Sequence, residues 1–251
     1  MDLELNDRVY IVTGGARGLG RATAGQLVAE GARVVLSGRN QESLAAAAAE
    51  LGDAAVFVTA DNADVGTPAR LVAAARESFG RLDGVLISVG GPPTGTVATT
   101  KDEDWVRAFE SVFLGAVRVA RGVVEELGEG GSVTFVLSSS VRSPIPGLTI
   151  SNGLRPGLAM VAKTLADEVG PRGIRVNGLM PGRIGTDRVA ELDASTGDAD
   201  AARERALKTI PLGRYGDPAE FGRAAAFLMS PASSFITGVM LPVDGGMLRT
   251  I

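Results

Sequence analysis

Short, almost wholly apolar runs alternate with longer amphipathic segments along the entire chain. Parallel strands covered on both faces appear in a sequence as continuous apolar runs, and each crossover between them is usually a helix. Strands are therefore predicted at residues 8–13, 33–37, 55–59, 84–89, 132–138, 174–180 and 238–242. Helices are predicted at residues 19–30, 41–51, 67–79, 101–127 (with a break at Gly115 or Gly122), 152–170, 201–209 and 218–229.

This alternation predicts an α/β protein with a doubly wound parallel sheet, the Rossmann fold. No linker-like stretch divides the chain, so residues 1–251 are expected to form a single domain. The polar stretch at residues 191–200 is predicted to be a mobile loop, within a substrate-covering segment at about residues 183–210. Loops of this kind vary freely between proteins, so the substrate itself is not readable.

Composition excludes several classes of function. The net charge is −4 and no block of Lys or Arg is present, which argues against nucleic-acid and anionic-membrane partners. Cysteine and histidine are both absent, which excludes disulfides, thiolate nucleophiles and Ser-His-Asp triads and leaves no favourable ligands for zinc or copper. No metal site is expected, and without a signal peptide or an apolar span of about 20 residues the protein is expected in the cytoplasm.

A glycine-rich turn joins the first predicted strand to the first helix. Glycines permit a tight turn and let a pyrophosphate approach the backbone, while the helix N-terminus supplies N–H donors and a favourable dipole. The alternative is a turn that only packs the helix on the strand. Phosphate binding is favoured because the motif lies in the first βα turn of an alternating pattern. The residues are Thr13, Gly14, Gly15, Ala16, Arg17, Gly18, Leu19 and Gly20.

The end of the second predicted strand indicates which dinucleotide binds. Proteins that bind NAD place an Asp or Glu there to hold the ribose 2′-hydroxyl, whereas this chain has Ser37, Gly38 and Arg39. Arg39, together with Arg17 from the glycine-rich turn, is suited to a 2′-phosphate because a guanidinium presents a planar fork of donors. The sequence therefore predicts NADP(H), the alternative being that both arginines are simply solvated.

These motifs resemble the short-chain dehydrogenase/reductase family, and the resemblance runs from about residue 8 to residue 246. It implies that Asp61 and Asn62 contact adenine, and that Gly90 ends a motif equivalent to the family's Asn-Ala-Gly, although Ser88 and Val89 replace the usual residues. It also implies a turn beside the nicotinamide formed by Pro181 and Gly182, followed by Ile184 and by Thr186, whose hydroxyl would bind the carboxamide. Residues 243–246 (VDGG) resemble the family's C-terminal signature.

The catalytic positions depart from the family. Members of the family that this chain resembles carry a Tyr-x-x-x-Lys motif. The matching window here holds Ser151 at the Tyr position and Arg155 at the Lys position. Arg155 would also hold the nicotinamide ribose, as the family's Lys does. The family's catalytic Ser matches Ser138, thirteen residues before Ser151, with Ser139 and Ser140 as close alternatives. Phe113 replaces the helix Asn.

Three interpretations of this window remain open. In the first, Arg155 and the serines stabilise an oxyanion while water or the substrate supplies the proton. In the second, the substrate is one that needs no protein acid, such as an imine that is already protonated. In the third, the protein binds NADP(H) without turnover and is a sensor or scaffold. Of the two tyrosines, Tyr10 lies in the first predicted strand, far from the substrate end of the sheet, so Tyr215 and the carboxylate of Asp187 are the remaining candidate donors. A Rossmann-type methyltransferase is the rival class, but the glycine spacing and the basic end of the second strand fit it poorly.

Partners follow partly from the resemblance. The substrate is expected to be a small molecule, and residues 144–146, Leu148 and Ile150 either wall its pocket or pack in the core. Family members usually form dimers or tetramers through two long helices, which correspond here to residues 101–127 and 152–170. Their content of Ala, Val, Leu and Gly suits close packing, so a homotetramer or homodimer is expected.

Overall fold

One sheet of seven parallel strands forms the centre of the molecule, in the order β3-β2-β1-β4-β5-β6-β7. The structure is a computed structural model, and it describes residues 2–250. The doubly wound parallel sheet predicted from the sequence is confirmed. The strands are β1 (Val9–Thr13), β2 (Arg33–Gly38), β3 (Ala55–Thr59), β4 (Gly84–Ile87), β5 (Ser132–Val136), β6 (Arg175–Pro181) and β7 (Met240–Val243).

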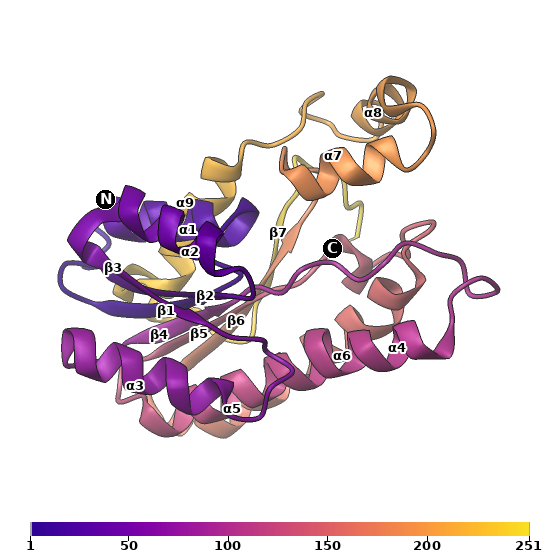
Figure 1. Cartoon of the computed structure of the whole chain (residues 1–251). Coiled ribbons are helices and arrows are strands. Elements are labelled where there is room, and N and C mark those ends of the chain that lie inside the picture. The colour runs from indigo at the N-terminus through magenta and orange to yellow at the C-terminus, as the bar shows by residue number, and fades with distance from the viewer. Residues whose placement is uncertain (1, 251) are drawn as a thin grey trace.

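Helices cover both faces of the sheet and bury one apolar cluster on each side (Figure 1). One face carries α1 (Gly18–Ala29), α2 (Gln41–Leu51) and α9 (Pro218–Met229). The other carries α3 (Thr67–Phe79), α5 (Gly115–Glu126) and α6 (Thr149–Val169). Short 3-10 turns lie at Gly52–Ala54, Ser139–Val141, Gly170–Arg172 and Pro231–Ser233. Because both faces are covered, β1, β4 and β5 are buried along their whole length.

The strand order reverses at β1, and this places the site. The chain builds β1, β2 and β3 outward in one direction, then returns to lay β4 on the other side of β1. The turns that follow β1 and β4 consequently diverge at the carboxyl ends of these strands, where open α/β sheets form the crevice that binds ligands. The Thr13 side chain ties the two strand ends together, since its Oγ1 donates to Ser88 O and accepts from Ser88 N, both at 2.9 Å.

The long helix predicted at residues 101–127 is interrupted. It consists of α4 (Asp102–Ala108), a π-helical segment (Phe109–Leu114) and α5. A break was predicted at Gly115 or Gly122, and the structure places it just before Gly115, where α5 begins. A Cβ there would lie 2.5 Å from Asn62 O, so the close approach of the loop after β3 requires glycine.

The prediction of a mobile loop at residues 191–200 is wrong. Residues 191–194 end α7 (Asp187–Ala194), residues 199 and 200 begin α8 (Ala199–Leu207), and only residues 195–198 form a turn between the two helices, which stand apart from the two layers in Figure 1. Asp198 caps α8 by accepting from Ala201 N at 2.9 Å, and Asp193 is buried within this lobe. The segment reads as a loop in the sequence because the lobe is small and most of its polar residues face solvent.

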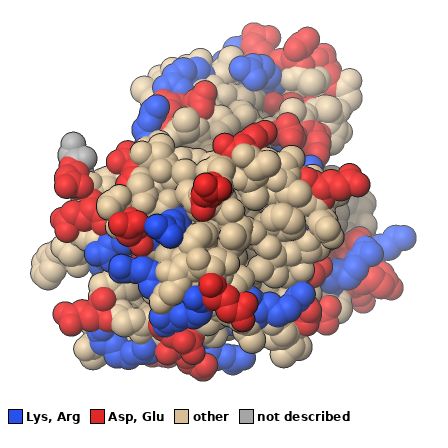
Figure 2. Space-filling model, turned by 60° about the vertical axis from the view of Figure 1, so that its left-hand side comes forward, with Lys and Arg blue, Asp and Glu red and all other residues tan. Residues whose placement is uncertain are grey.

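The surface carries charges of both signs. On the face in Figure 2, Lys and Arg are interspersed with Asp and Glu rather than gathered into one large patch. Within residues 2–250, no helix is long and apolar enough to span a membrane, and no group of three or more carboxylates is arranged to hold a metal ion.

Candidate active site

The glycine-rich turn adopts a conformation that only glycine accommodates easily. Gly14 and Gly18 have φ values of 61° and 57°, in the left-handed region that L side chains rarely occupy. A Cβ at Gly14 would also lie 2.7 Å from Ser88 O, at the end of β4. The turn thus passes over the end of β4 and is the tight turn that the sequence predicts.

The N-terminus of α1 has no side-chain cap. Its N-cap residue is Arg17, which accepts no hydrogen bond from the first turn, whereas Asn40 caps α2 by accepting from Ser43 N at 2.8 Å. The first-turn N–H groups of α1 therefore lack a side-chain acceptor and face the crevice beside the glycine-rich turn. A phosphate is the ligand that such a helix end favours.

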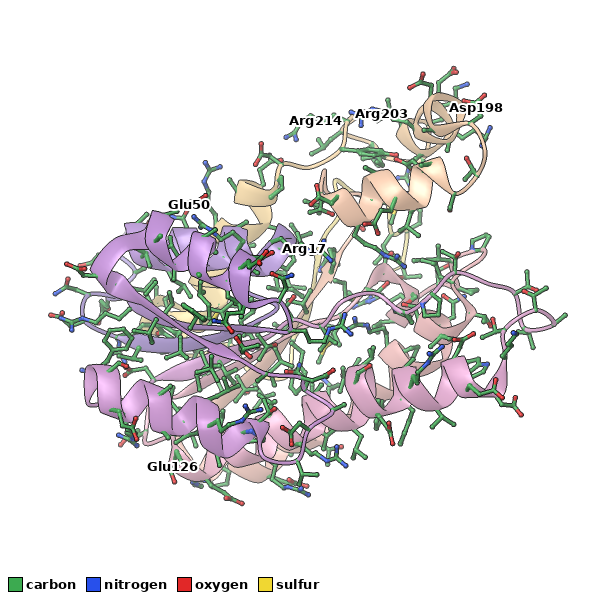
Figure 3. All side chains as sticks on the ribbon, in the orientation of Figure 1. Arg17, Glu50, Glu126, Asp198, Arg203 and Arg214 are labelled. Carbon is green, nitrogen blue, oxygen red and sulfur yellow. The ribbon has the colours of Figure 1, made fainter. Side chains whose placement is uncertain are left out.

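Two cations flank this turn. Arg17 and Arg39 are exposed, and within residues 2–250 neither makes an ion pair or a side-chain hydrogen bond. Figure 3 shows Arg17 at the end of α1 nearest to α7. Ser37 lies beneath the turn, where its carbonyl accepts from Gly15 N at 3.0 Å and its buried Oγ has no partner within the described residues. Asn40 is occupied as the cap of α2.

The loop after β3 is held rigidly beside the crevice. The Asp61 carboxylate accepts from Ala63 N at 3.0 Å, and the Asp61 carbonyl accepts from Thr67 Oγ1 at 2.6 Å. Asn62 is buried against Gly115 of α5, and Arg118 Nη1 donates to Ala63 O at 2.9 Å. Asp61 therefore shapes the loop with one carboxylate oxygen, and within residues 2–250 the other oxygen accepts no hydrogen bond.

The segment after β6 closes the far side of the crevice. Gly182 packs on Asp244, because a Cβ there would lie 2.7 Å from Asp244 Cβ, and Ile184 is buried. The methyl of Thr186 would lie 3.8 Å from a Cβ at Gly18, so the structure brings the two predicted cofactor segments together. Pro181 ends β6 immediately before them. The glycine-rich turn, an uncapped helix end and free arginines in one crevice fit a phosphorylated dinucleotide.

Hydroxyl groups meet at the window predicted from the sequence to be catalytic. Ser140 Oγ lies 3.2 Å from Ser151 Oγ, and both side chains are buried. Ser138 is half-buried, and its Oγ instead accepts from Ser140 N at 3.1 Å. Of the three candidate serines, Ser140 is thus the one that contacts Ser151, while Ser138 caps the short turn that positions Ser140.

Arg155 lies one helical turn beyond Ser151 and is 5% exposed. Its Nη1 donates to Val136 O at 2.7 Å, and its Nη2 donates to Val89 O at 3.3 Å, so it joins the ends of β4 and β5. Within residues 2–250 no carboxylate pairs with it. Burial lowers the pKa of the guanidinium from its ordinary value to about 10, and it remains a cation near neutrality.

Neither tyrosine stands in this window. Tyr10 is buried in β1 and donates to Met229 O at 3.2 Å, and burial raises its pKa. Tyr215 donates to Asp193 Oδ2 at 2.9 Å inside the lobe of α7 and α8, and burial together with this bond raises its pKa also. Arg183 Nη1 donates to the other oxygen of Asp193 at 2.8 Å, so Tyr215 is locked into the lobe. Asp187 is exposed at the start of α7.

An aromatic residue borders the window from the π-helical segment. Phe113 stacks on Phe109 with ring centroids 5.3 Å apart, and a Cβ at Gly157 of α6 would lie 3.1 Å from its ring. Beside the N-terminus of α6, a shallow cavity of about 270 Å³ lies between two loops. Its lining includes residues 95–97 and 144–147, so residues 144–146 border a cavity, whereas Ile150 is buried in the core.

One residue at the site was not predicted from the sequence. Arg188 of α7 reaches across the crevice, and its Nη2 donates to Pro92 O at 2.7 Å. A Cβ at Gly91 would lie 2.8 Å from Arg188 Nε, so the guanidinium rests on the backbone of Gly91. The sequence signal was slight, namely a basic residue shortly after the Pro181-Gly182 turn.

Known oxidoreductases are similar to this chain over nearly its whole length. The sequence model described as enoyl-(acyl carrier protein) reductase matches residues 14–248. L-rhamnose 1-dehydrogenase (NAD(P)(+)) of Azotobacter vinelandii is 36% identical, over 97% of either chain. L-sorbose reductase from Gluconobacter frateurii, solved in complex with NADPH and L-sorbose, is 30% identical, with a TM-score of 0.93 over the whole of both chains. A short-chain dehydrogenase/reductase from Brucella melitensis gives the same values.

Proposed function

The chain belongs to the short-chain dehydrogenase/reductase family of oxidoreductases, and from that premise we propose that it is an NADP(H)-dependent enzyme with an atypical active site for a small-molecule substrate. When bound, the dinucleotide would donate or accept a hydride. All other chemistry falls to residues of the chain, and these differ from the family's Tyr and Lys.

Preference for NADP(H) is supported by the two cations beside the glycine-rich turn. Arg39 at the end of β2 and Arg17 at the start of α1 have no partner within residues 2–250, and β2 ends without a carboxylate. An acidic residue there would hold a ribose 2′-hydroxyl and repel a 2′-phosphate. The L-sorbose reductase structure was solved with NADPH, and the L-rhamnose dehydrogenase is named for both dinucleotides.

The observation that carries the catalytic proposal is the buried, unpaired guanidinium of Arg155 beside the hydroxyl pair of Ser140 and Ser151. Arg155 has five N–H donors, and two of its nitrogens bind carbonyl groups, so donors remain for the nicotinamide ribose and for a developing oxyanion. Fixed donors in a dry site stabilise such an anion strongly. A water molecule or the substrate would then supply the proton, because no protein group in the window can.

A protonated imine is the less favoured substrate. It would bring a second positive charge next to Arg155, which already lacks a counter-charge within the described residues. Like charges at close range inside a protein repel strongly. A neutral carbonyl, which becomes negative during reduction, suits the same guanidinium.

A second function is favoured by the place of the tyrosines. Both are buried, and both hydroxyls are bound elsewhere, so the window contains no group that releases a proton near neutrality. A protein of this kind binds NADP(H) and turns over slowly or not at all, as a sensor or scaffold would. The two functions share the dinucleotide and differ in hydride transfer.

Titration with NADPH, followed by its fluorescence, tests the shared part, and S-adenosylmethionine should leave the melting temperature unchanged. Single variants test the catalytic part: Ser140→Ala and Ser151→Ala should lower kcat by about 10²–10³-fold, as loss of an oxyanion donor does, and leave the Kd for NADPH unchanged. Ser143→Ala, an exposed hydroxyl on the same loop, is the control. Binding of NADPH without hydride transfer to any carbonyl would favour the sensor, and absence of binding would contradict both functions.

A further inference from the structure

Two guanidinium groups hold the segment after β4 from opposite sides. Arg155 of α6 binds Val89 O at 3.3 Å, and Arg188 of α7 binds Pro92 O at 2.7 Å. Three residues of extended chain span at most about 10 Å, so the two carbonyl groups lie within that distance of each other. The two cations therefore bracket one short stretch of backbone.

The space over this stretch is open. A Cβ at Gly90 would meet no atom within 4 Å, so nothing fills the region above its backbone. At Gly91 a Cβ would lie 2.8 Å from Arg188 Nε, which means that glycine is required for the guanidinium to rest where it does. Two successive glycines thus leave room for a ligand and for the side chain that would bind it.

Positive charge in this space is not balanced. Arg155 has no acidic partner within residues 2–250. The ion pair of Arg188 is with Glu191, at 3.6 Å and on the same helix, and Glu191 is largely exposed, so this pair contributes little. Asp187 on the same helix is exposed, and residues 89–92 carry no charged side chain. An anion entering the space would meet two cations.

Arg188 points away from the glycine-rich turn. Thr186, two residues earlier, lies against Gly18 of the glycine-rich turn, whereas Arg188 reaches to Gly91 and Pro92. The loop that continues from Pro92 forms one wall of the 270 Å³ cavity, through residues 95–97. Arg188 thus holds the start of the loop that forms this wall.

We propose that Arg188 binds a carboxylate of the substrate, and that the substrates are short oxo acids or the matching hydroxy acids. This inference rests on the proposed function. The oxo group would lie at Ser140, Ser151 and Arg155, with the carboxylate at Arg188. NADPH, oxidised to NADP⁺, would supply the hydride for the carbonyl carbon; the C=O π pair would become an alkoxide that takes a proton from water, leaving hydroxide, and the carboxylate would be unchanged. A guanidinium suits a carboxylate because the two form parallel hydrogen bonds.

Calorimetric titration of acids against their methyl esters tests this directly. Pyruvate, acetoacetate and 4-oxopentanoate, each paired with its ester, are titrated into protein saturated with NADP⁺, where no turnover is possible because both partners are oxidised. At least one acid should bind about ten- to a hundredfold more tightly than its ester, the range that a charge-assisted contact supports. Arg188→Gln should remove that difference and leave the Kd for NADP⁺ within twofold.

Two further variants complete the test. Gly91→Ala keeps the charge of Arg188 but displaces its guanidinium. It should also weaken the binding of the acid more than that of its ester. Arg205→Gln, an exposed arginine on α8, is the matched control and should change neither affinity. The inference is overturned if no acid binds better than its ester. It is also overturned if Arg188→Gln weakens the binding of NADP⁺, which would assign the guanidinium to the cofactor's phosphates. Failure of the wild type to bind NADP⁺ would instead contradict the proposed function.

Discussion

Replacing Gly38 by Asp, together with Arg39→Ala, should convert the preference for NADPH into one for NADH. Gly38 ends β2, where an acidic residue would face the adenine ribose. The structure accommodates the new side chain, because a Cβ at Gly38 would meet only Leu44, at 3.7 Å, which is ordinary van der Waals contact. The backbone of Gly38 is also outside the left-handed region, so no strain is added.

The magnitude follows from two contributions. Loss of the Arg39 contact costs about 1.5–3 kcal/mol, and the low end applies because Arg39 is exposed and screened by salt. A carboxylate about 4 Å from a phosphate charge in water-like surroundings adds about 1 kcal/mol of repulsion for each charge. Together they amount to about 3 kcal/mol, or roughly a hundredfold change in the ratio of the two dissociation constants.

Fluorescence titration with NADPH and NADH measures that ratio for the wild type, each single variant and the double variant, at two salt concentrations. Arg205→Ala on α8 serves as the control. The NADPH advantage should shrink at high salt in the wild type and reverse in the double variant. Equal affinities of the wild type for the two dinucleotides would refute the reasoning.

Three further predictions concern stability and assembly. Gly14→Ala should lower the free energy of unfolding by at least about 1–2 kcal/mol, because its φ is 61° and a Cβ would lie 2.7 Å from a carbonyl oxygen; Gly128→Ala, where the space is open, is the control, and equal denaturant midpoints would contradict the reasoning. Asp193→Asn breaks a buried pair and should reduce hydrogen-exchange protection of α7 and α8, whereas the exposed Asp200→Asn should not; unchanged protection would show that Asp193 is not needed. Light scattering at micromolar concentration should give a mass well above the monomer's 25.7 kDa, because α4 and α6 expose apolar side chains, and a monomeric mass would defeat this.

Much of the fold can be predicted from the sequence because its periodicities are unambiguous. The strand at residues 55–59 and the helices at 41–51, 67–79 and 218–229 match the structure at both ends. The lobe formed by α7 and α8 could not be predicted in this way, since Asp193 is polar in the sequence but buried by partners from elsewhere in the chain, Arg183 and Tyr215. A pattern of hydrophobicity does not contain such long-range pairs.

The site shows the same division. The glycine-rich turn could be predicted because its residues are contiguous, and Thr186 because of its motif. Counting residues selects Ser138, but the hydroxyl that contacts Ser151 belongs to Ser140, since the chain turns tightly between them. Arg188 could not be found by spacing, because its contact with Pro92 joins two segments far apart in the sequence.

The most direct test of the account is the reduction of simple ketones by NADPH, with the wild type compared with Ser151→Tyr/Arg155→Lys. A positioned general acid contributes about 10²–10⁴-fold, and neither Ser151 nor Arg155 can release a proton near neutral pH. Ser151→Phe/Arg155→Lys, which adds the same ring and ammonium group but no phenol hydroxyl, is the control. The account predicts normal binding of NADPH by the wild type, very slow ketone reduction, and a rise of at least about tenfold in the double variant, limited by Phe113. Rapid reduction by the wild type, unchanged by the double substitution, would contradict it and point to another donor such as Asp187.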